Sequence, residues 1–138
     1  MKILLINPAV RPDSPKLLPN VGLAYIATAI KNAGIDFEIL DIDAYRYTEE
    51  EVEKLLRTKK FDAVGIGTLV SQYKWTKSIA HAIKGICPHA PIIVGNTLGT
   101  SIPEILLQKT DADIAVLGEG DVTIIDLLTK INNGAPLS

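Results

Sequence analysis

The chain has 138 residues, of which 47% are hydrophobic and 22% are charged, and its net charge is −2. This length suffices for one domain with its own core, and the slightly negative charge argues against a surface for nucleic acid or an anionic membrane, which needs clustered lysine and arginine. The single cysteine, Cys87, excludes an internal disulfide and any iron–sulfur cluster that this chain could ligate alone.

The first half of the chain alternates hydrophobic runs with helical patterns. Lys2–Ile6 is an almost continuous apolar run, typical of a parallel strand covered on both faces. A helical spacing follows and stops at Gly34, a residue type that ends helices. Asp36–Leu40 predicts a second strand. Thr48, with Glu51 three residues later, fits a capping box that begins the next helix.

The second half repeats this alternation three times. The predicted strands are Ala63–Ile66, Pro91–Val94 and Ile114–Leu117. The helical patterns after them are 73–86, a short one beginning at Pro103, and 122–131, with Asp121 suited to cap the last. Five strand–helix units predict an α/β fold: a Rossmann-like or flavodoxin-like, doubly wound, five-stranded parallel sheet in the order 2-1-3-4-5.

This strand order predicts where a ligand would bind. The chain reverses direction between the first and third strands, and a crevice opens at their carboxyl ends. The loops expected to line it are 7–20, which holds four of the eight prolines, and 67–72, flanked by 95–101 and 118–121. Glycines at the ends of three strands leave room there for a bulky ligand against the sheet.

No catalytic machinery is visible. His81 and His89 belong to no cluster with metal-ligand spacing, so both are expected to be structural or solvated, and Cys87 is expected to be a small buried hydrophobe. Asn7-Pro8 follows the first strand where a nicotinamide dinucleotide site needs Gly-x-Gly-x-x-Gly. The prolines of that loop also remove N–H donors that a flavin phosphate would need.

Several segments together resemble a known family. They are Lys2–Pro8, Gly22–Ala27, Ala33-Gly34, Asp62–Thr68, Pro91–Gly95 and Asp113–Gly120. Their order and spacing resemble the cobalamin-binding domains that precede the catalytic domain of radical S-adenosylmethionine enzymes.

The resemblance implies a cobalamin-binding domain over residues 1–133 and the start of a linker to a missing catalytic domain at 134–138. Parent enzymes of this family are most often methyltransferases, and the resemblance implies the same here. The isolated domain would catalyse nothing. S-adenosylmethionine and a 4Fe–4S cluster would belong only to the downstream domain. The partners implied are cobalamin and that domain, with neither nucleic acid nor a membrane. Because no hydrophobic run approaches the roughly 20 residues that span a bilayer and no signal-peptide cleavage site is present, we expect a cytoplasmic protein.

The resemblance also implies site residues, with one departure from the family's pattern. The family's Asp-x-His-x-x-Gly loop has no histidine here, which excludes a lower-axial imidazole from residues 7–12. The implied cofactor contacts are Asn7, Val10 (on the lower side of cobalt), Gly67, Thr68, Leu69, Gly95, Asn96, Gly118, Glu119 and Gly120. None is a metal ligand or a catalytic residue.

Two alternatives stay open. Asn96 stands where the family has glycine, and its side chain would lie in the path of the cofactor's tail. The chain could therefore be a cofactor-free structural or substrate-recognition domain of the same enzyme class. A free-standing binder of another nucleotide-like ligand is the second alternative.

Overall fold

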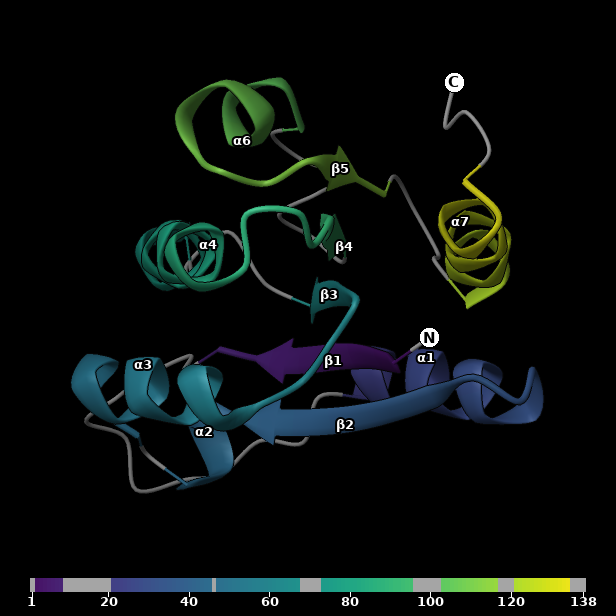
Figure 1. Cartoon of the computed structure of the whole chain (residues 1–138), viewed down its shortest axis with the longest axis horizontal. Helices are drawn as coiled ribbons and strands as arrows, with labels where there is room; N and C mark the ends of the chain where they lie inside the picture. The colour runs from purple at the N-terminus through teal and green to yellow at the C-terminus, as the bar shows by residue number, and fades with distance from the viewer. Residues whose placement is uncertain are drawn as a thin grey trace.

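The computed structural model describes residues 2–8, 21–45, 47–67, 73–95, 103–116 and 121–134. Five strands form one parallel sheet in the order β2-β1-β3-β4-β5 (Figure 1). The strands are β1 (Lys2–Asn7), β2 (Asp36–Asp41), β3 (Ala63–Gly67), β4 (Ile92–Gly95) and β5 (Ile114–Ala115). The predicted fold and strand order are both confirmed.

Helices cover both faces of the sheet (Figure 1). On one face lie α1 (Val21–Asn32) and α7 (Asp121–Asn132); on the other lie α2 (Ile42–Tyr45), α3 (Glu49–Thr58) and α4 (Tyr73–Ile86), with α6 (Pro103–Lys109) beside β5. The short helix α2 is not among the predicted elements. None of the helices described is long and apolar enough to cross a membrane.

The sheet separates two hydrophobic cores. Alternate residues of a strand point to opposite faces. Leu4 and Ile6 of β1 therefore pack into the core beneath α3 and α4, whereas Ile3 and Leu5 pack into the core beneath α1 and α7. These four side chains are at most 1% exposed. Burial on both faces explains why the strands read as continuous apolar runs.

Two helix ends form where the sequence predicts them. Thr48 caps α3: the Glu51 N–H donates to its hydroxyl oxygen at 3.2 Å, and that hydroxyl lies 3.2 Å from the Glu51 carboxylate. The N-cap half of the predicted capping box is therefore present, while the Glu51 carboxylate accepts from the Thr48 hydroxyl rather than from its backbone N–H. Gly34, after α1, has a φ of 75°, a left-handed conformation that glycine adopts without steric cost.

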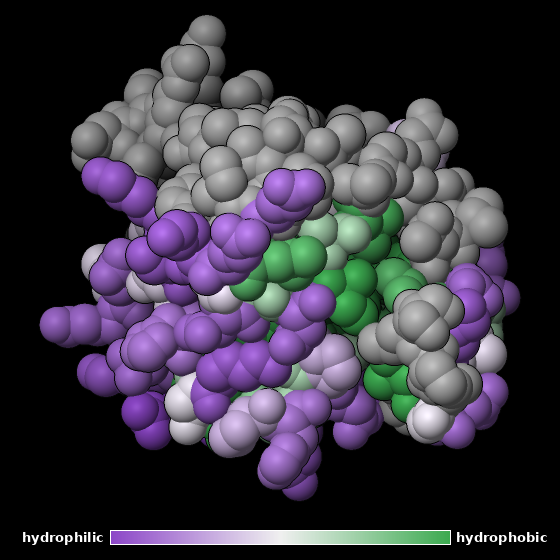
Figure 2. Space-filling model, turned by 90° about the horizontal axis from the view of Figure 1, so that it is seen from above, coloured by the Kyte–Doolittle hydropathy of each residue, from purple (hydrophilic) through white to green (hydrophobic). Residues whose placement is uncertain are grey.

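β5 is a short strand at the edge of the sheet. It spans two residues, Ile114 and Ala115, both half-buried, rather than the predicted Ile114–Leu117. The Val116 N–H still donates to the Val94 carbonyl at 2.8 Å, and Leu117 lies outside the described residues. Figure 2, which looks onto this edge, shows hydrophobic side chains gathered in the middle of the face, between hydrophilic surfaces on either side.

Candidate functional site

The carboxyl ends of four strands align in one row. Asn7 of β1 pairs in register with Asp41 of β2, and Gly67 of β3 pairs with Gly95 of β4. Because Ile6 pairs with Ile66, the next residues, Asn7 and Gly67, are also neighbours. The row therefore runs Asp41, Asn7, Gly67, Gly95 across the sheet's carboxyl edge, where open α/β sheets bind ligands.

This row faces α1 and α7. Leu5, Ala63 and Ile93 lie in the core beneath those helices. Residues an even number of positions further along the same strand point to the same face, and these include Asn7, Gly67 and Gly95. The row thus ends β3 and β4 with two neighbouring glycines, of which Gly67 is buried and Gly95 is half-buried. A Cβ atom built on Gly95 would meet nothing closer than Val116 Cβ, at 3.9 Å. The edge therefore has room above Gly95.

At Gly65, two residues before the end of β3 and on the same face, there is no such space for a side chain. A Cβ atom on Gly65 would lie 3.0 Å from Leu5 Cδ2, which is tighter than an ordinary van der Waals contact. The Leu5 side chain, which is 1% exposed, covers the backbone of β3 at this level. The room found above Gly95 therefore does not extend down to the level of Gly65.

The other half of the row is a polar pair. The Asn7 side chain is 4% exposed, and its Nδ2 donates a hydrogen bond to Asp41 Oδ1 at 2.9 Å. Asp41 is not among the site residues predicted from the sequence. The signal that could have identified it is its place at the end of the second strand, level with Asn7 in a 2-1-3 sheet.

Three of the predicted cofactor-contacting residues, Asn7, Gly67 and Gly95, lie in this row. The remainder fall outside the described residues, so their placement stays a prediction; they are Val10, Thr68, Leu69, Asn96, Gly118, Glu119 and Gly120.

The histidines and the cysteine lie away from this edge. His81 is an exposed residue of α4, with its Nδ1 3.1 Å from Asp111 Oδ2, and His89 is exposed in the turn after α4. Cys87, predicted to be a small buried hydrophobe, is half-buried, because it borders a surface pocket. Among the described residues, no three His, Cys, Asp or Glu side chains form a group that could hold a metal ion.

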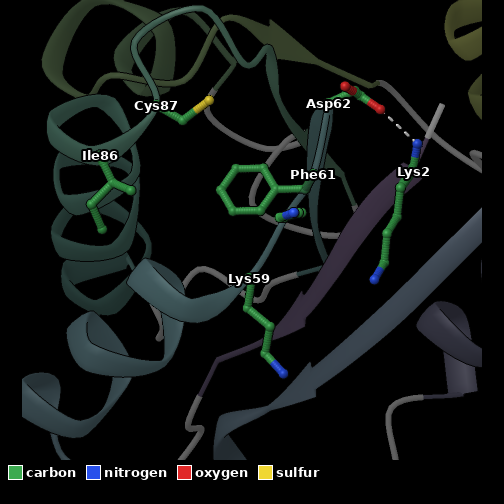
Figure 3. A pocket seen from close by; sticks show the side chains of 7 residues that line it. Lys2, Lys59, Phe61, Asp62, Ile86 and Cys87 are labelled. Atoms are coloured by element: carbon green, nitrogen blue, oxygen red, sulfur yellow. Dashed lines mark hydrogen bonds between the residues drawn. The ribbon is translucent and has the colours of Figure 1, made fainter.

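That pocket lies at the opposite, amino edge of the sheet (Figure 3). It has a volume of about 340 Å³ and is lined by Lys2, Lys59, Lys60, Phe61, Asp62, Ile86 and Cys87. Most of its charges are already paired. Glu38 binds Lys59 and lies 3.3 Å from Lys2 Nζ, while Asp62 Oδ2 accepts the Lys2 backbone N–H at 2.8 Å. The carboxyl edge is therefore the stronger candidate.

The Glu38 ion pairs make stability depend on pH. The hydrogen bond from Lys59, with a second from Lys2, holds the pKa of Glu38 below its ordinary value. A carboxyl whose pKa is lowered by folding stabilises the fold above its unfolded pKa, and this contribution is lost as pH falls through the folded pKa. We expect Glu38→Gln to cost at most about 1 kcal/mol at pH 7, because solvent screens partly exposed pairs.

Thermal unfolding of wild type and Glu38→Gln from pH 7 down to pH 3 measures this effect. The difference between the two should shrink as the pH falls. Glu53→Gln, which breaks the more exposed ion pair with Arg57, is the matched control and should change stability less. A Glu38→Gln difference that is equally large at both ends of the pH range would contradict the assignment.

Comparison with known proteins extends over nearly the whole chain. The family model described as "B12 binding domain" matches residues 9–128. The chain is 25% identical to cytidylyl-2-hydroxyethylphosphonate methyltransferase of Streptomyces wedmorensis, covering 95% of this chain and 28% of that protein. It is 28% identical to an uncharacterized methyltransferase of Pyrococcus horikoshii, covering 99% and 31%. It is also 24% identical to the anaerobic magnesium-protoporphyrin IX monomethyl ester cyclase of Rubrivivax gelatinosus, covering 97% and 25%.

Solved structures share the fold. The radical S-adenosylmethionine methyltransferase TsrM of Kitasatospora setae, with cobalamin and a 4Fe–4S cluster bound, superposes with a TM-score of 0.82 at 19% identity, over 99% of this chain and 25% of that one. The cobalamin-dependent S-adenosylmethionine radical enzyme OxsB, with aqua-cobalamin and S-adenosylmethionine bound, gives 0.82 at 20% identity, over 99% and 19%.

The chain thus spans only 28% and 31% of the first two curated relatives. The family model, however, covers most of the chain, from before the first helix to the last one. The chain belongs to the B12-binding domain family.

Proposed function

We propose that this domain holds cobalamin at the carboxyl edge of its sheet, as the cofactor module of a radical S-adenosylmethionine enzyme. The observation that carries this proposal is the open space above Gly95, which lies beside Gly67 at the carboxyl edge, in a chain of the B12-binding family. The nucleotide tail of cobalamin would enter over these two glycines, because no side chain of theirs fills that space.

The chain's own residues would orient the cofactor rather than ligate its metal. Residues 7–12 contain no histidine, so they would offer no imidazole to cobalt, and Val10 would contribute a hydrophobic side chain to the site instead. Thr68 would donate its hydroxyl to the tail, with Leu69 packing beside it. Bound cobalamin supplies a cobalt centre that can carry a methyl group, and the protein supplies binding and orientation.

The reaction itself would belong to another part of the parent protein. A cluster motif of the form Cys-x-x-x-Cys-x-x-Cys needs three cysteines, and this chain has one. S-adenosylmethionine and the 4Fe–4S cluster would therefore bind to a radical domain elsewhere in the parent. Two of the curated relatives are named as methyltransferases, which favours methyl transfer as the parent's reaction.

Hydroxocobalamin retention tests the proposal directly. We expect the purified domain, mixed with hydroxocobalamin and then desalted, to keep corrin absorbance at a one-to-one ratio. A parallel sample with flavin mononucleotide tests the alternative of a binder for another nucleotide-like ligand, and should retain none. A domain that is folded by circular dichroism but keeps no corrin would refute the proposal for the isolated domain.

The cofactor-free alternative rests on Asn96, which replaces a glycine of the family's pattern. If that side chain blocks the tail, the wild type will not bind the corrin, and Asn96→Gly will restore binding. If the proposal is right, wild type and Asn96→Gly will both bind.

A further inference from the structure

The pocket at the amino edge of the sheet has an apolar side and a cationic side (Figure 3). The Phe61 ring stands between them, with Ile86 and Cys87 on one side and Lys2 and Lys59 on the other. Phe61, Ile86 and Cys87 are half-buried, so each still exposes part of its apolar surface. The volume of about 340 Å³ lies within the range of small-molecule sites, roughly 300 to 1,000 Å³. The pocket therefore has room for a small organic ligand.

Positive charge exceeds negative charge around this pocket. Among the described residues that line it or pair with its lysines, three lysines (Lys2, Lys59 and Lys60) stand beside two carboxylates (Glu38 and Asp62). Glu38 is shared between Lys2 and Lys59, and Asp62 accepts the backbone N–H of Lys2. A ligand with a single negative charge would balance the charges that remain.

Lys60 is the lysine whose ammonium group is available to such a ligand. Within the part of the chain that the structure describes, the exposed Lys60 side chain forms neither a hydrogen bond nor an ion pair. A lysine ammonium is a compact charge with three N–H donors, which a carboxylate can accept. Lys59 lies next to it in the chain, and its side chain is only 22% exposed because it reaches Glu38.

We infer that this pocket binds small aromatic carboxylates. The carboxylate binds the Lys60 ammonium, and the ring packs against Phe61 and Ile86, since aromatic rings favour stacked or edge-to-face contact with one another. The pocket lies at the edge opposite to the one proposed for cobalamin, so this binding needs no cofactor. The inference is therefore independent of the proposed function, and either can fail without the other.

The lysines have a second explanation, with a different outcome. If they served only to neutralise Glu38 at the surface, the pocket would not distinguish a ligand that has both a ring and a charge from one that has only one of them. Three probes separate the two explanations: benzoate has a ring and a carboxylate, acetate lacks the ring, and benzamide lacks the charge.

Titration of the wild-type chain with each probe, followed by nuclear magnetic resonance of the backbone N–H groups, measures the binding. Sodium chloride keeps the ionic strength constant, because salt screens surface charges. We expect benzoate to shift the N–H signals of Phe61, Asp62 and Cys87 in a saturable manner. Its Kd should be about tenfold lower than that of acetate, which buries no ring, and about threefold lower than that of benzamide, which forms no ion pair.

Four variants test the charges of the pocket. Lys60→Gln should bind benzoate about threefold to fivefold more weakly, as for the loss of a surface ion pair. Lys54→Gln removes the same charge from an exposed position of α3 and should bind like wild type. Glu38→Gln should bind benzoate up to about fivefold more tightly, because it releases Lys2 and Lys59 from their shared partner. Glu53→Gln removes the same charge elsewhere on α3 and should have no effect.

Three results would overturn the inference. They are benzoate and acetate binding with equal Kd, benzoate shifts that leave Phe61, Asp62 and Cys87 unchanged, and wild-type affinity for benzoate in Lys60→Gln. If Lys60→Gln does not fold, Glu38→Gln takes its place, and an affinity no higher than that of Glu53→Gln would overturn the inference in the same way.

Discussion

Replacing Gly95 by leucine is expected to weaken cobalamin binding by about 100-fold or more, which corresponds to about 2.7 kcal/mol, while the domain stays folded. The first protein atom that a Cβ at this position would meet is 3.9 Å away, an ordinary van der Waals distance. Gly95 also lies at the end of its strand and is half-exposed. The added side chain would therefore occupy the space proposed for the nucleotide tail rather than disturb the core.

Titration of hydroxocobalamin into the purified variant, followed by its visible absorbance, measures this loss. Gly95→Ala should give an intermediate loss, because it adds one carbon. Gly85→Ala on α4 is the matched control, since its Cβ would have no neighbour within 4 Å, and it should bind like wild type. Equal affinity of Gly95→Leu and wild type would show that the tail passes elsewhere.

Replacing Leu4 by alanine is expected to lower the free energy of unfolding by about 3 to 4 kcal/mol. Leu4 is 1% exposed at the middle of β1, in the core beneath α3 and α4. The loss combines the transfer free energy of the removed carbons with the cavity left between strands that are held by their neighbours on both sides. Urea unfolding followed by circular dichroism gives the value.

Ile39→Ala is the control for that measurement. Ile39→Ala removes as many carbon atoms as Leu4→Ala, but Ile39 lies on the outer strand β2 and is 46% exposed. Ile39→Ala should lower the free energy of unfolding by less than about 1 kcal/mol, because a side chain that is largely exposed buries little apolar area on folding. Equal losses at Leu4 and Ile39 would mean that the sheet does not bury its central strand as described.

Much of the fold is predictable because both sides of each central strand are buried. Runs such as Lys2–Ile6 and Ala63–Ile66 then carry an unbroken apolar signal, and both strands form within one residue of the predicted bounds. Right-handed crossovers between parallel strands leave few strand orders, and the predicted 2-1-3-4-5 is the one observed. The N-cap at Thr48 is likewise local chemistry and is found as predicted.

Features that depend on packing at a distance are harder to predict. The length of β5 is set by its pairing with β4, which the apolar run around Ile114 does not encode. The hydrogen bond between Asn7 and Asp41 depends on the register of two strands whose residues lie 34 positions apart in the chain. The exposure of Cys87 arises because Phe61 and the lysines of another connection border it across a pocket. Glycines at strand ends are predictable because each directly follows an apolar run in the sequence.

The two edges of the sheet also limit association between copies of the protein. An exposed strand edge offers unpaired backbone groups to other chains, and proteins protect such edges by shortness or by charge. β5 uses the first device, since two residues give little length for intermolecular pairing. β2 is six residues long and uses the second, because Glu38 and its lysine partners place charges beside it. The ion pairs of Glu38 thus disfavour pairing of β2 with a strand of another copy of the protein.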